Sequence, residues 1–410
     1  MKISSVVITG SSTYGVKNHG DDAMLATLVQ GLKAVSPAVK ITFLCRHPDA
    51  DYDRVFGFQS LKNLDHNSKV ESAGRLFFGF NLGDPDEHLK AIVKALSDAD
   101  LLIIGGNSFM EIFPNEFLKG VSSYAVTLAL IAKFLGTPFA LYGANVVDKI
   151  RQDTTRDHAR FLVGNASAVT LRENSGKQLL LDAGVCEKNL HVLGDPAFGI
   201  EAREFNVQKL LDHQGISLNE KPVIGVSFRL EYWSGEEDSF SLVCLQLAAA
   251  LNEIIDRLNV QVLLIPNCTY THGNKWQDDR LVHREIKSHI TQKNQVFCVE
   301  EELTIFETLA LYSLLDMHIS NRRHSCVFAA LNAVPFIAID VSLTGHMRPF
   351  VTDLGVPDQL IKFESSETIE KMALGTWDDR EAIKKKMAPN VDRLIKSART
   401  HIPIILESCS

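Results

Sequence analysis

The chain has 410 residues, of which 45% are hydrophobic and 22% are charged, and its formal net charge at pH 7 is −8. This length exceeds what one hydrophobic core usually serves, so we expect two domains. The acidic balance and the lack of a basic block argue against nucleic acid as a main partner. No apolar segment is long enough to cross a bilayer, and the apolar run at residues 3–8 is too short for a signal peptide. We therefore expect a cytoplasmic protein.

The seven cysteines are scattered and form no C-x-x-C pair, which predicts thiols in a reducing compartment. The histidines show no metal-ligand spacing, so no metal site is expected. Cys326 lies close to a candidate site, but its position on an apolar helical face favours packing over a role as nucleophile. The acidic runs are interpreted as solvated loop and helix-cap charges, at Glu236-Glu237, Asp278-Asp279 and 300–302.

In the first half of the chain, short β-rich runs alternate with longer helical runs, as is typical of a parallel α/β sheet. The predicted strands lie at residues 5–9, 40–45, 101–105, 138–142, 168–171 and 191–193. The predicted helices lie at residues 21–35, 124–135, 154–164 and 174–183. Residues 1–200 are therefore expected to form one doubly wound α/β domain.

A polar run after residue 200 is the best candidate for a domain boundary, and a second α/β series follows it. Its predicted strands lie at residues 223–228, 260–265, 295–299, 317–319 and 336–339. A long amphipathic helix is predicted at 378–402, packed across this second domain or back onto the first. The predicted fold class is thus α/β, with two doubly wound Rossmann-like domains (1–200 and 201–410) facing a cleft, a GT-B-like architecture.

The densest group of polar residues lies at the junction between the strand at 317–319 and the apolar run that follows it. In a parallel sheet this junction lies at the carboxyl end of a strand, where ligands bind and a following helix favours an anion. Arg322 can clamp a phosphate or carboxylate in bidentate fashion, and His324 can carry a proton near neutral pH. The sequence therefore predicts an anion-binding site with an acid/base beside it.

A plainer interpretation is a surface ion-pair cluster in which Ser320 or Ser325 merely caps a helix. Arg229 weighs against it, because this arginine ends the strand at 223–228. In a doubly wound domain it would emerge at the same sheet edge as Arg322 and His324. We regard this convergence as the strongest structural prediction from the sequence.

The loop at residues 10–22 also follows a predicted strand, and its glycines permit close approach of the backbone to a ligand. It is neither a G-x-G-x-x-G fingerprint nor a Walker A sequence, so it does not indicate NAD or ATP. Asn18, His19 and Asp21 can bind a sugar hydroxyl or deprotonate one. Equally, Asp21 and Asp22 can be simple helix caps.

Two further segments carry candidate residues in the first domain. The run Gly105-Gly106-Asn107-Ser108 ends an apolar strand, where glycine has a plain turn role and Asn107 is placed to bond an acceptor hydroxyl. Arg172 and Glu173 are best interpreted as an ion pair that steadies this domain.

Several of these motifs, taken together and in order, resemble the signatures of the polysaccharide pyruvyl transferase family. The resemblance extends from about residue 8 to residue 355, which makes chance an unsatisfactory explanation. The matching segments are Gly15 to Leu25, with its N-x-G-D loop, Ile103-Ile104-Gly105-Gly106-Asn107-Ser108, Leu171-Arg172-Glu173-Asn174-Ser175, Gly194-Asp195-Pro196-Ala197-Phe198, Ile224-Gly225-Val226-Ser227-Phe228-Arg229 and Ser320-x-Arg322-x-His324-Ser325.

The resemblance implies a GT-B-like enzyme of cell-envelope exopolysaccharide biosynthesis. Such an enzyme moves a pyruvyl group from phosphoenolpyruvate, its co-substrate, to two sugar hydroxyls and leaves a ketal; no other cofactor is implied. The acceptor would be a sugar or a lipid-linked oligosaccharide, with at most transient contact at the inner face of the membrane. Whether the chain forms homo-oligomers is left open.

The expected site residues follow from the chemistry, which needs an acid/base and cationic clamps. The catalytic residues would be His324 and Arg322. The donor-binding residues, in the second domain, would be Arg229, Arg322, Arg323, Ser325 and His346. The acceptor-binding residues, in the first domain, would be Asn18, His19, Gly20, Asp21, Gly106 and Asn107.

The chain departs from the family pattern in two places. Arg323 stands where many members have leucine, and Asp340 with Thr344-Gly345-His346 replaces a segment that carries a tyrosine and a lysine. We expect Arg323 or His346 to supply the missing charge. The alternative functions are a GT-B glycosyltransferase that uses a nucleotide sugar, with Asp340 as ribose ligand, and a non-catalytic sugar-phosphate binding protein.

Overall fold

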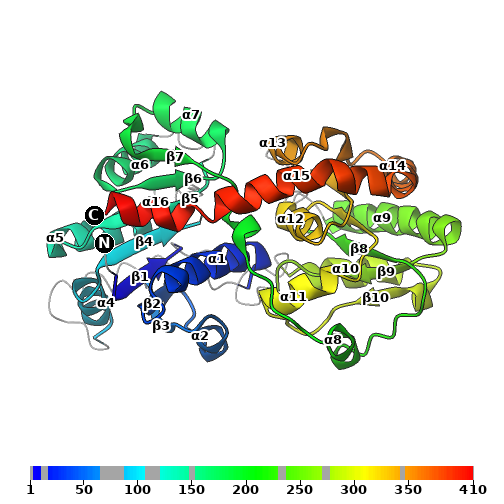
Figure 1. Ribbon diagram of the computed structural model, residues 1–410. Helices are drawn as coiled ribbons and strands as arrows, with labels where there is room; N and C mark the ends of the chain where they lie inside the picture. Colours follow the sequence, from blue (N-terminus) through cyan, green and yellow to red (C-terminus); the bar gives the residue numbers. More distant parts are fainter. Residues whose placement is uncertain are drawn as a thin grey trace. The chain divides into compact units, whose positions relative to one another are not determined.

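The computed structural model describes residues 3–10, 17–64, 87–106, 121–146, 153–229, 237–269, 278–341 and 347–409 (Figure 1). The chain divides into two compact units. The first comprises Met1–Val16, Asp21–Glu201 and Leu394–Ser410, and the second comprises Lys17–Gly20 and Ala202–Arg393. Each unit is built on a parallel sheet with flanking helices, so the predicted α/β, GT-B-like fold class is confirmed.

The sheet of the first unit has seven strands in the order β3-β2-β1-β4-β5-β6-β7. Its order reverses between β1 and β4, where Val6 pairs with Leu101. The strands are β1 (Ser5–Thr9), β2 (Lys40–Cys45), β3 (Gln59–Lys62), β4 (Leu101–Gly105), β5 (Phe139–Ala144), β6 (Val169–Leu171) and β7 (Leu190–Val192).

Helices flank this sheet, and α5 contacts both α4 and α6 in one layer. The helices are α1 (His19–Val35), α2 (Ala50–Phe56), α4 (His88–Ser97), α5 (Val121–Leu135), α6 (Asp153–Asn165), α7 (Asn174–Asp182) and α16 (His401–Ser408). A large cluster of buried apolar side chains packs between the sheet and its helices, which explains why continuous apolar runs identified the central strands.

The sheet of the second unit has six strands in the order β10-β9-β8-β11-β12-β13, so its order reverses between β8 and β11. The strands are β8 (Val223–Ser227), β9 (Gln261–Leu264), β10 (Val296–Cys298), β11 (Met317–Ser320), β12 (Phe336–Asp340) and β13 (Leu360–Lys362). Two strands were not predicted, β3 and β13. Both are short, lie at a sheet edge and are only partly buried, so the apolar signal is weak there.

The helices of the second unit are α8 (Val207–His213), α9 (Glu237–Leu258), α10 (Asp279–Ser288), α11 (Ile305–Tyr312), α12 (Arg323–Leu331), α13 (Met347–Asp353), α14 (Ser366–Asp378) and α15 (Arg380–Ala398). Short 3-10 turns lie at Glu187–Asn189, Pro196–Gly199, Lys293–Gln295 and Pro357–Gln359. None of the helices in the described ranges is both long and apolar enough to span a bilayer.

The helix predicted at 378–402 corresponds to α15 (Arg380–Ala398), which begins two residues later and ends four residues earlier. α14 ends at its C-cap Asp379, α15 ends at Ala398, and α16 is a separate helix. The residues from Leu394 onward belong to the first unit, where they are anchored by polar contacts. Gly194 donates its backbone N–H to Ser397 Oγ at 2.9 Å, and the His401 ring lies 2.8 Å from Thr170 Oγ1 and 2.9 Å from the Gly194 carbonyl.

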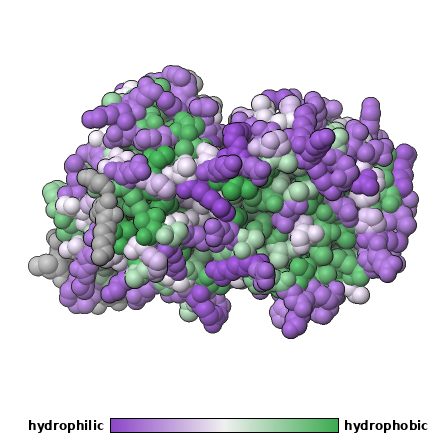
Figure 2. All heavy atoms as spheres, in the orientation of Figure 1, coloured by the Kyte–Doolittle hydropathy of each residue, from purple (hydrophilic) through white to green (hydrophobic). Residues whose placement is uncertain are grey.

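The amphipathic character predicted for this region is present in α15. Ile383, Met387, Val391 and Leu394 recur at helical spacing and are buried. In the view of Figure 2, the outward side of α14 and α15 is largely hydrophilic. The apolar pattern thus identified the helical face correctly, while the breaks depend on caps and contacts elsewhere in the chain.

Buried histidines make the fold sensitive to acid. His318 in β11 is wholly buried, with its ring 5.1 Å from that of Tyr312. Burial lowers the pKa of His318 to about 3 and that of His401 to about 4, from an ordinary value of 6.5. Between pH 6.5 and these lower pKa values, the folded protein therefore binds fewer protons than the unfolded chain. The stabilisation is fully present above pH 6.5 and is lost as the pH falls toward the folded pKa values.

We predict that His318→Phe reduces this acid sensitivity, because phenylalanine keeps the ring and removes the titration. Between pH 6 and pH 4.5, the free energy of unfolding should fall less steeply in the variant, by about 1.4 kcal/mol per pH unit. Denaturant titrations of both proteins across this range measure the two slopes. Equal slopes in the two proteins would contradict this account, because they would mean that His318 binds its proton equally well in the folded and the unfolded chain.

Candidate functional site

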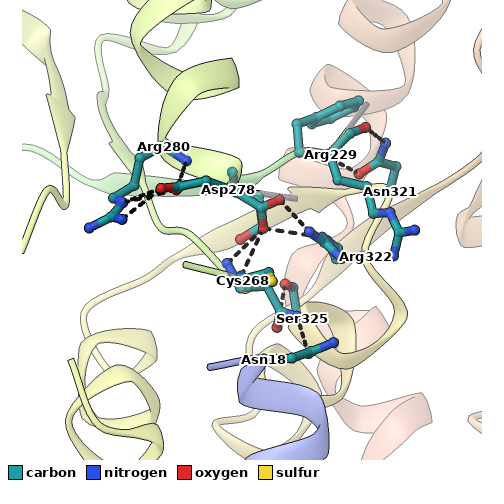
Figure 3. Close-up of polar contacts among 12 residues, drawn as sticks. Asn18, Arg229, Cys268, Asp278, Arg280, Asn321, Arg322 and Ser325 are labelled. Atoms are coloured by element: carbon teal, nitrogen blue, oxygen red, sulfur yellow. Dashed lines mark hydrogen bonds and ion pairs between the residues drawn. The ribbon is translucent and has the colours of Figure 1, made fainter. Parts of the chain in front are cut away.

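The loops that leave β8 and β11 are neighbours at the point where the second sheet reverses its order. Ser227 and Ser320, the last residues of the two strands, are in register. The side chain of Asn321 then joins the loops: its Nδ2 donates to the Arg229 carbonyl at 2.8 Å, and its Oδ1 accepts from the Arg229 N–H at 3.0 Å (Figure 3). Arg229 and Arg322 are thus brought to one sheet edge, the place where ligands bind in open α/β sheets.

The side chain of Arg322 is buried, with only 6% of its surface exposed, and it pairs with Asp279, which is fully buried. Its Nε donates to Asp279 Oδ2 at 3.1 Å, and its Nη2 bonds Asp279 Oδ1. The same Oδ2 accepts the backbone N–H groups of Asn267 and Cys268, each at 3.0 Å (Figure 3). The pair is therefore bidentate, and the carboxylate is satisfied on both oxygens.

This finding corrects the interpretation of Asp278-Asp279 as solvated charges. Asp278 is indeed a cap, since its side chain accepts from the backbone N–H of Arg280 at the start of α10. Asp279 is not solvated, because it follows this cap into the interior of the unit. One helical turn later, His283 accepts a hydrogen bond from the Phe228 N–H at 3.3 Å, and burial lowers the pKa of His283 to about 4.

The serines of the motif do not cap α12. Arg322 occupies the N-cap position, with an extended backbone and no hydrogen bond from its side chain to the helix. Ser320 Oγ instead accepts the Arg322 N–H at 2.8 Å and donates to the Ser227 carbonyl at 2.7 Å, which ties β11 to β8. The plain interpretation of Ser320 and Ser325 as helix caps is therefore wrong.

Arg323 and His324 occupy the first turn of α12, and both are half-buried. The guanidinium of Arg323 lies over the ring of Phe350, 5.5 Å from its centroid, which is within the range of a cation–π contact. Arg323 thus joins Arg229 and Arg322 at the carboxyl edge of the sheet, where Asp279 balances the charge of Arg322. The site thus combines positive charge, a helix N-terminus and an imidazole.

Residues Lys17–Gly20 belong to the second unit and pack beside this histidine. Asn18 forms an isolated antiparallel bridge with Cys268, and the His19 N–H donates to the Asn267 carbonyl at 2.9 Å. A Cβ atom added to Gly20 would lie 2.0 Å from Nδ1 of His324 and 2.4 Å from its Cγ. The backbone of the predicted acceptor loop therefore lies directly against the predicted acid/base.

A chain of side-chain contacts supports this segment. Ser325 Oγ donates to Asn267 Oδ1 at 3.3 Å, Asn267 Nδ2 donates to Asn18 Oδ1 at 3.3 Å, and Asn18 Oδ1 accepts the Gly20 N–H at 3.1 Å. Asn18 thus caps α1, a role that we had considered for Asp21 and Asp22. His19 is buried with its Nε2 3.1 Å from the Leu303 carbonyl, and burial lowers its pKa.

The remaining predicted acceptor residues lie in the first unit. Asp21 and Asp22 occupy the first turn of α1 and are buried, and the Tyr52 hydroxyl donates to Asp22 Oδ1 at 2.8 Å. Gly106 follows β4 with a φ of 72°, a conformation that favours glycine. Asn107 lies outside the described residues, as does His346 of the predicted donor site.

Other predictions can be compared with the structure. Arg172 pairs with Asp195, at 3.6 Å between Nη1 and Oδ2, rather than with its neighbour in sequence as we had interpreted it. Cys326 is fully buried, and burial raises the pKa of its thiol, as a packing role requires. Asp340 is half-buried at the end of β12. Within the described ranges, no group of three or more histidine, cysteine or acidic side chains is placed to hold a metal ion.

The sequence model of the polysaccharide pyruvyl transferase family matches residues 18–342. The chain belongs to this family. One relative, the amylovoran biosynthesis protein AmsJ of Erwinia amylovora, is 22% identical to it over 425 aligned residues that cover 95% of each protein. Family membership makes the chain a transferase of polysaccharide biosynthesis, and it confirms the resemblance carried by the motifs.

Solved structures share the fold of this transferase at low sequence identity. A putative UDP-N-acetylglucosamine 2-epimerase of Listeria monocytogenes aligns over 100% of this chain and 97% of its own, with a TM-score of 0.65 and 14% identity. HepE of Anabaena, solved in complex with UDP, aligns over 99% and 100%, with a TM-score of 0.59 and 14% identity. These similarities establish that this chain has a GT-B-like architecture.

Three residues of the site were not predicted: Asp279, Asn267 and Asn321. Asn321 lies inside the motif, between two residues that were singled out. Asn267 follows β9 and Asp279 opens the next helix, so both lie at the carboxyl edge of the sheet that carries β8 and β11. They could have been predicted by considering the polar residues that follow every strand at this edge, and not only those that follow the two strands with arginines.

We predict that Gly20→Ala displaces the imidazole of His324, because the added methyl group would overlap the ring. The side chain has to move by far more than a few tenths of an ångström to relieve contacts of 2.0 and 2.4 Å. Ring proton NMR signals, assigned to His324 by comparison with a His324→Gln variant, should shift. Gly164→Ala in α6 is the matched control, since a Cβ added there meets nothing within 4 Å. A His324 signal that is the same in both alanine variants would contradict the packing described.

Proposed function

We propose that this transferase moves the pyruvyl group of phosphoenolpyruvate to two hydroxyls of a sugar and forms a ketal in exopolysaccharide biosynthesis. The observation that carries the proposal is that Arg229, Arg322, Arg323 and His324 follow β8 and β11 at one sheet edge, where the order of a parallel sheet reverses. Family membership supports it independently. This group of residues supplies what the reaction requires: guanidinium groups for a trianionic donor and an imidazole that can give and accept a proton.

The reaction proceeds by addition and elimination. Protonation of the methylene carbon of phosphoenolpyruvate turns its vinyl group into a methyl group and leaves an oxocarbenium-like carbon. One sugar hydroxyl attacks this carbon and loses its proton. The bond between carbon and the phosphate oxygen then breaks, inorganic phosphate departs, and the second hydroxyl closes the ketal. Two hydroxyl protons are released, one proton is consumed by the methyl group and one leaves with phosphate, so the reaction balances.

We assign each predicted catalytic and donor-binding residue a role in this scheme. His324 donates the proton to the methylene carbon and receives one from an attacking hydroxyl. Arg322, Arg229 and Arg323 bind the carboxylate and phosphate of the donor, with His346 as a further cation and Ser325 holding the adjoining loop through Asn267. A guanidinium in a buried setting acts more strongly on a developing charge than one in water.

We assign the acceptor sugar to the residues that the sequence predicts for it. Asn18, His19 and Gly20 hold the backbone against the imidazole, and Asp21, Gly106 and Asn107 complete the set predicted from the sequence. A sugar or a lipid-linked oligosaccharide fits this reaction. With a lipid-linked acceptor, the enzyme would work in the cytoplasm and visit the inner face of the membrane, and the donor needs no further cofactor.

A nucleotide-sugar glycosyltransferase is the competing function, because HepE of the same fold was solved with UDP-glucose. In that case Asp340, at the end of β12, would be the carboxylate placed to bind a ribose. A non-catalytic sugar-phosphate binding protein would use the same arginines without turnover. The two alternatives differ from the proposal in the donor that they bind and in the product that they release.

We predict that phosphoenolpyruvate raises the thermal unfolding midpoint of the full chain more than UDP-glucose or UDP-N-acetylglucosamine does. A ligand that binds only the folded state stabilises it by about 2.7 kcal/mol when present at a hundred times its Kd. The same samples, mixed with a panel of sugar acceptors, should release inorganic phosphate and no UDP. A midpoint raised by a UDP-sugar alone, with release of UDP, would establish the glycosyltransferase. A shift without any release would establish the binding protein.

We predict that His324→Gln folds and still binds phosphoenolpyruvate, while turnover falls by about a hundredfold or more, the scale of a lost proton-transfer group. Glutamine keeps a polar side chain of similar reach but cannot exchange protons. His213→Gln is the matched control, because His213 is an exposed residue that pairs with Glu301 at the surface. Near-normal turnover of His324→Gln would assign the proton transfer to another residue.

A further inference from the structure

The carboxylate of Asp279 is shared between two parts of the site. Its Oδ1 and Oδ2 hold the guanidinium of Arg322, and Oδ2 also holds the N–H groups of Asn267 and Cys268. We infer that Asp279 is a positioning residue that fixes the donor-binding arginine and the acceptor segment at once. This inference rests on the proposed function, since donor and acceptor are assigned by it.

On the donor side, Asp279 determines which edge of Arg322 faces away from the ligand. It engages the edge formed by Nε and Nη2, and the planar guanidinium is then fixed in orientation by a two-point contact. A guanidinium held in this way loses little further freedom when a donor anion binds. Asp279 therefore contributes to donor binding without touching the donor.

On the acceptor side, Asp279 fixes the two residues that receive the segment Lys17–Gly20. The Asn267 carbonyl accepts the His19 N–H, the Asn267 amide group bonds Asn18, and Cys268 bridges to Asn18. Gly20, at the end of the segment, packs on His324. A movement of the Asn267–Cys268 backbone would therefore displace the acceptor segment and the imidazole together.

The negative charge and both oxygens are needed for this double role. Asparagine has nearly the same shape, but its amide group would place an N–H donor either against Nη2 of Arg322 or against Nε of Arg322 and the two backbone N–H groups. Both alternatives set donor against donor in a buried place, where an unmade hydrogen bond is costly. Asp279→Asn is therefore a small change in volume that disturbs Arg322 in either orientation, and the loss of the negative charge weakens the hydrogen bonds to the Asn267 and Cys268 N–H groups as well.

The expected kinetic signature separates Asp279 from Arg322. Arg322→Lys keeps the charge but not the two-point contact, so it should raise the KM for phosphoenolpyruvate about tenfold or more and leave the KM for the acceptor near that of the parent. Asp279→Asn should raise both KM values and also lower kcat, because His324 is no longer held in place. In the double variant the effects on the donor KM should be less than multiplicative, since both changes remove the same ion pair.

The test measures both KM values and kcat for the full-length single and double variants, with phosphoenolpyruvate and the best sugar acceptor of the parent. Asp195→Asn is the matched control, because Asp195 is also a buried carboxylate paired with an arginine, Arg172, in the first unit. It should leave both KM values unchanged even where it lowers the thermal midpoint. Asp279→Glu retains the charge and should recover part of the acceptor KM.

An Asp279→Asn variant with parental KM values, or one that alters the donor KM alone, would overturn the inference. If Asp279→Asn does not fold, Asp279→Glu decides the same question, since its longer side chain shifts the loop and must then raise the acceptor KM. A parent chain that binds phosphoenolpyruvate but transfers nothing would refute the proposed function instead. Calorimetric titration of the variants with phosphoenolpyruvate would then test whether Asp279 contributes to donor binding. An affinity of Asp279→Asn equal to that of the parent would contradict the inference.

Discussion

The ion pair between Asp279 and Arg322 is the interaction on which the rest of the site depends. Both side chains are buried, so the pair is favourable only because its geometry is bidentate and the remaining acceptor positions are used by backbone N–H groups. Removing one partner from such a pair typically costs about 3–5 kcal/mol. A chain could achieve stability more simply with apolar residues here, which suggests that the pair is kept for the position it gives to a cation.

The position of that cation follows from the topology of the second sheet. The strand order reverses between β8 and β11, and such a reversal leaves a place where a ligand can approach the sheet edge. The sequence places arginines on both loops and starts α12 immediately after, and Asn321 locks the two loops together. The chemistry attributed to His324 is thus built on the ends of rigid elements rather than on long loops.

Much of this arrangement could be predicted from the sequence, because it depends on local patterns. Continuous apolar runs gave most central strands to within a residue or two, and the arginines at their ends indicated the sheet edge of the site. The edge strands β3 and β13 were missed because half-exposed short strands carry little apolar signal. The partner of Arg322 was missed because a buried aspartate and a helix cap look alike in sequence, and their difference depends on a contact 43 residues away in the chain.

The place of Lys17–Gly20 could not be predicted for a similar reason. Its residues were assigned to the first unit because they precede the first helix predicted for that unit, yet their hydrogen bonds are made to Asn267, Thr269 and Leu303 of the second. The sequence nevertheless marks the segment as unusual, since Gly20 stands inside the first turn of a helix, where alanine would be more stable. Its contact with His324 supplies the reason, because only glycine leaves room for the imidazole.

The central claim is that the donor is phosphoenolpyruvate and the product is a ketal, and NMR of the reaction with phosphoenolpyruvate labelled with carbon-13 at its second carbon tests it most directly. The label begins as a vinyl carbon bonded to one oxygen. We predict that, with a suitable sugar acceptor, it becomes a quaternary ketal carbon coupled to a new methyl group, with one phosphate released for each ketal formed. Labelled free pyruvate as the sole product, or an unchanged vinyl signal while UDP-sugar is consumed, would contradict this account.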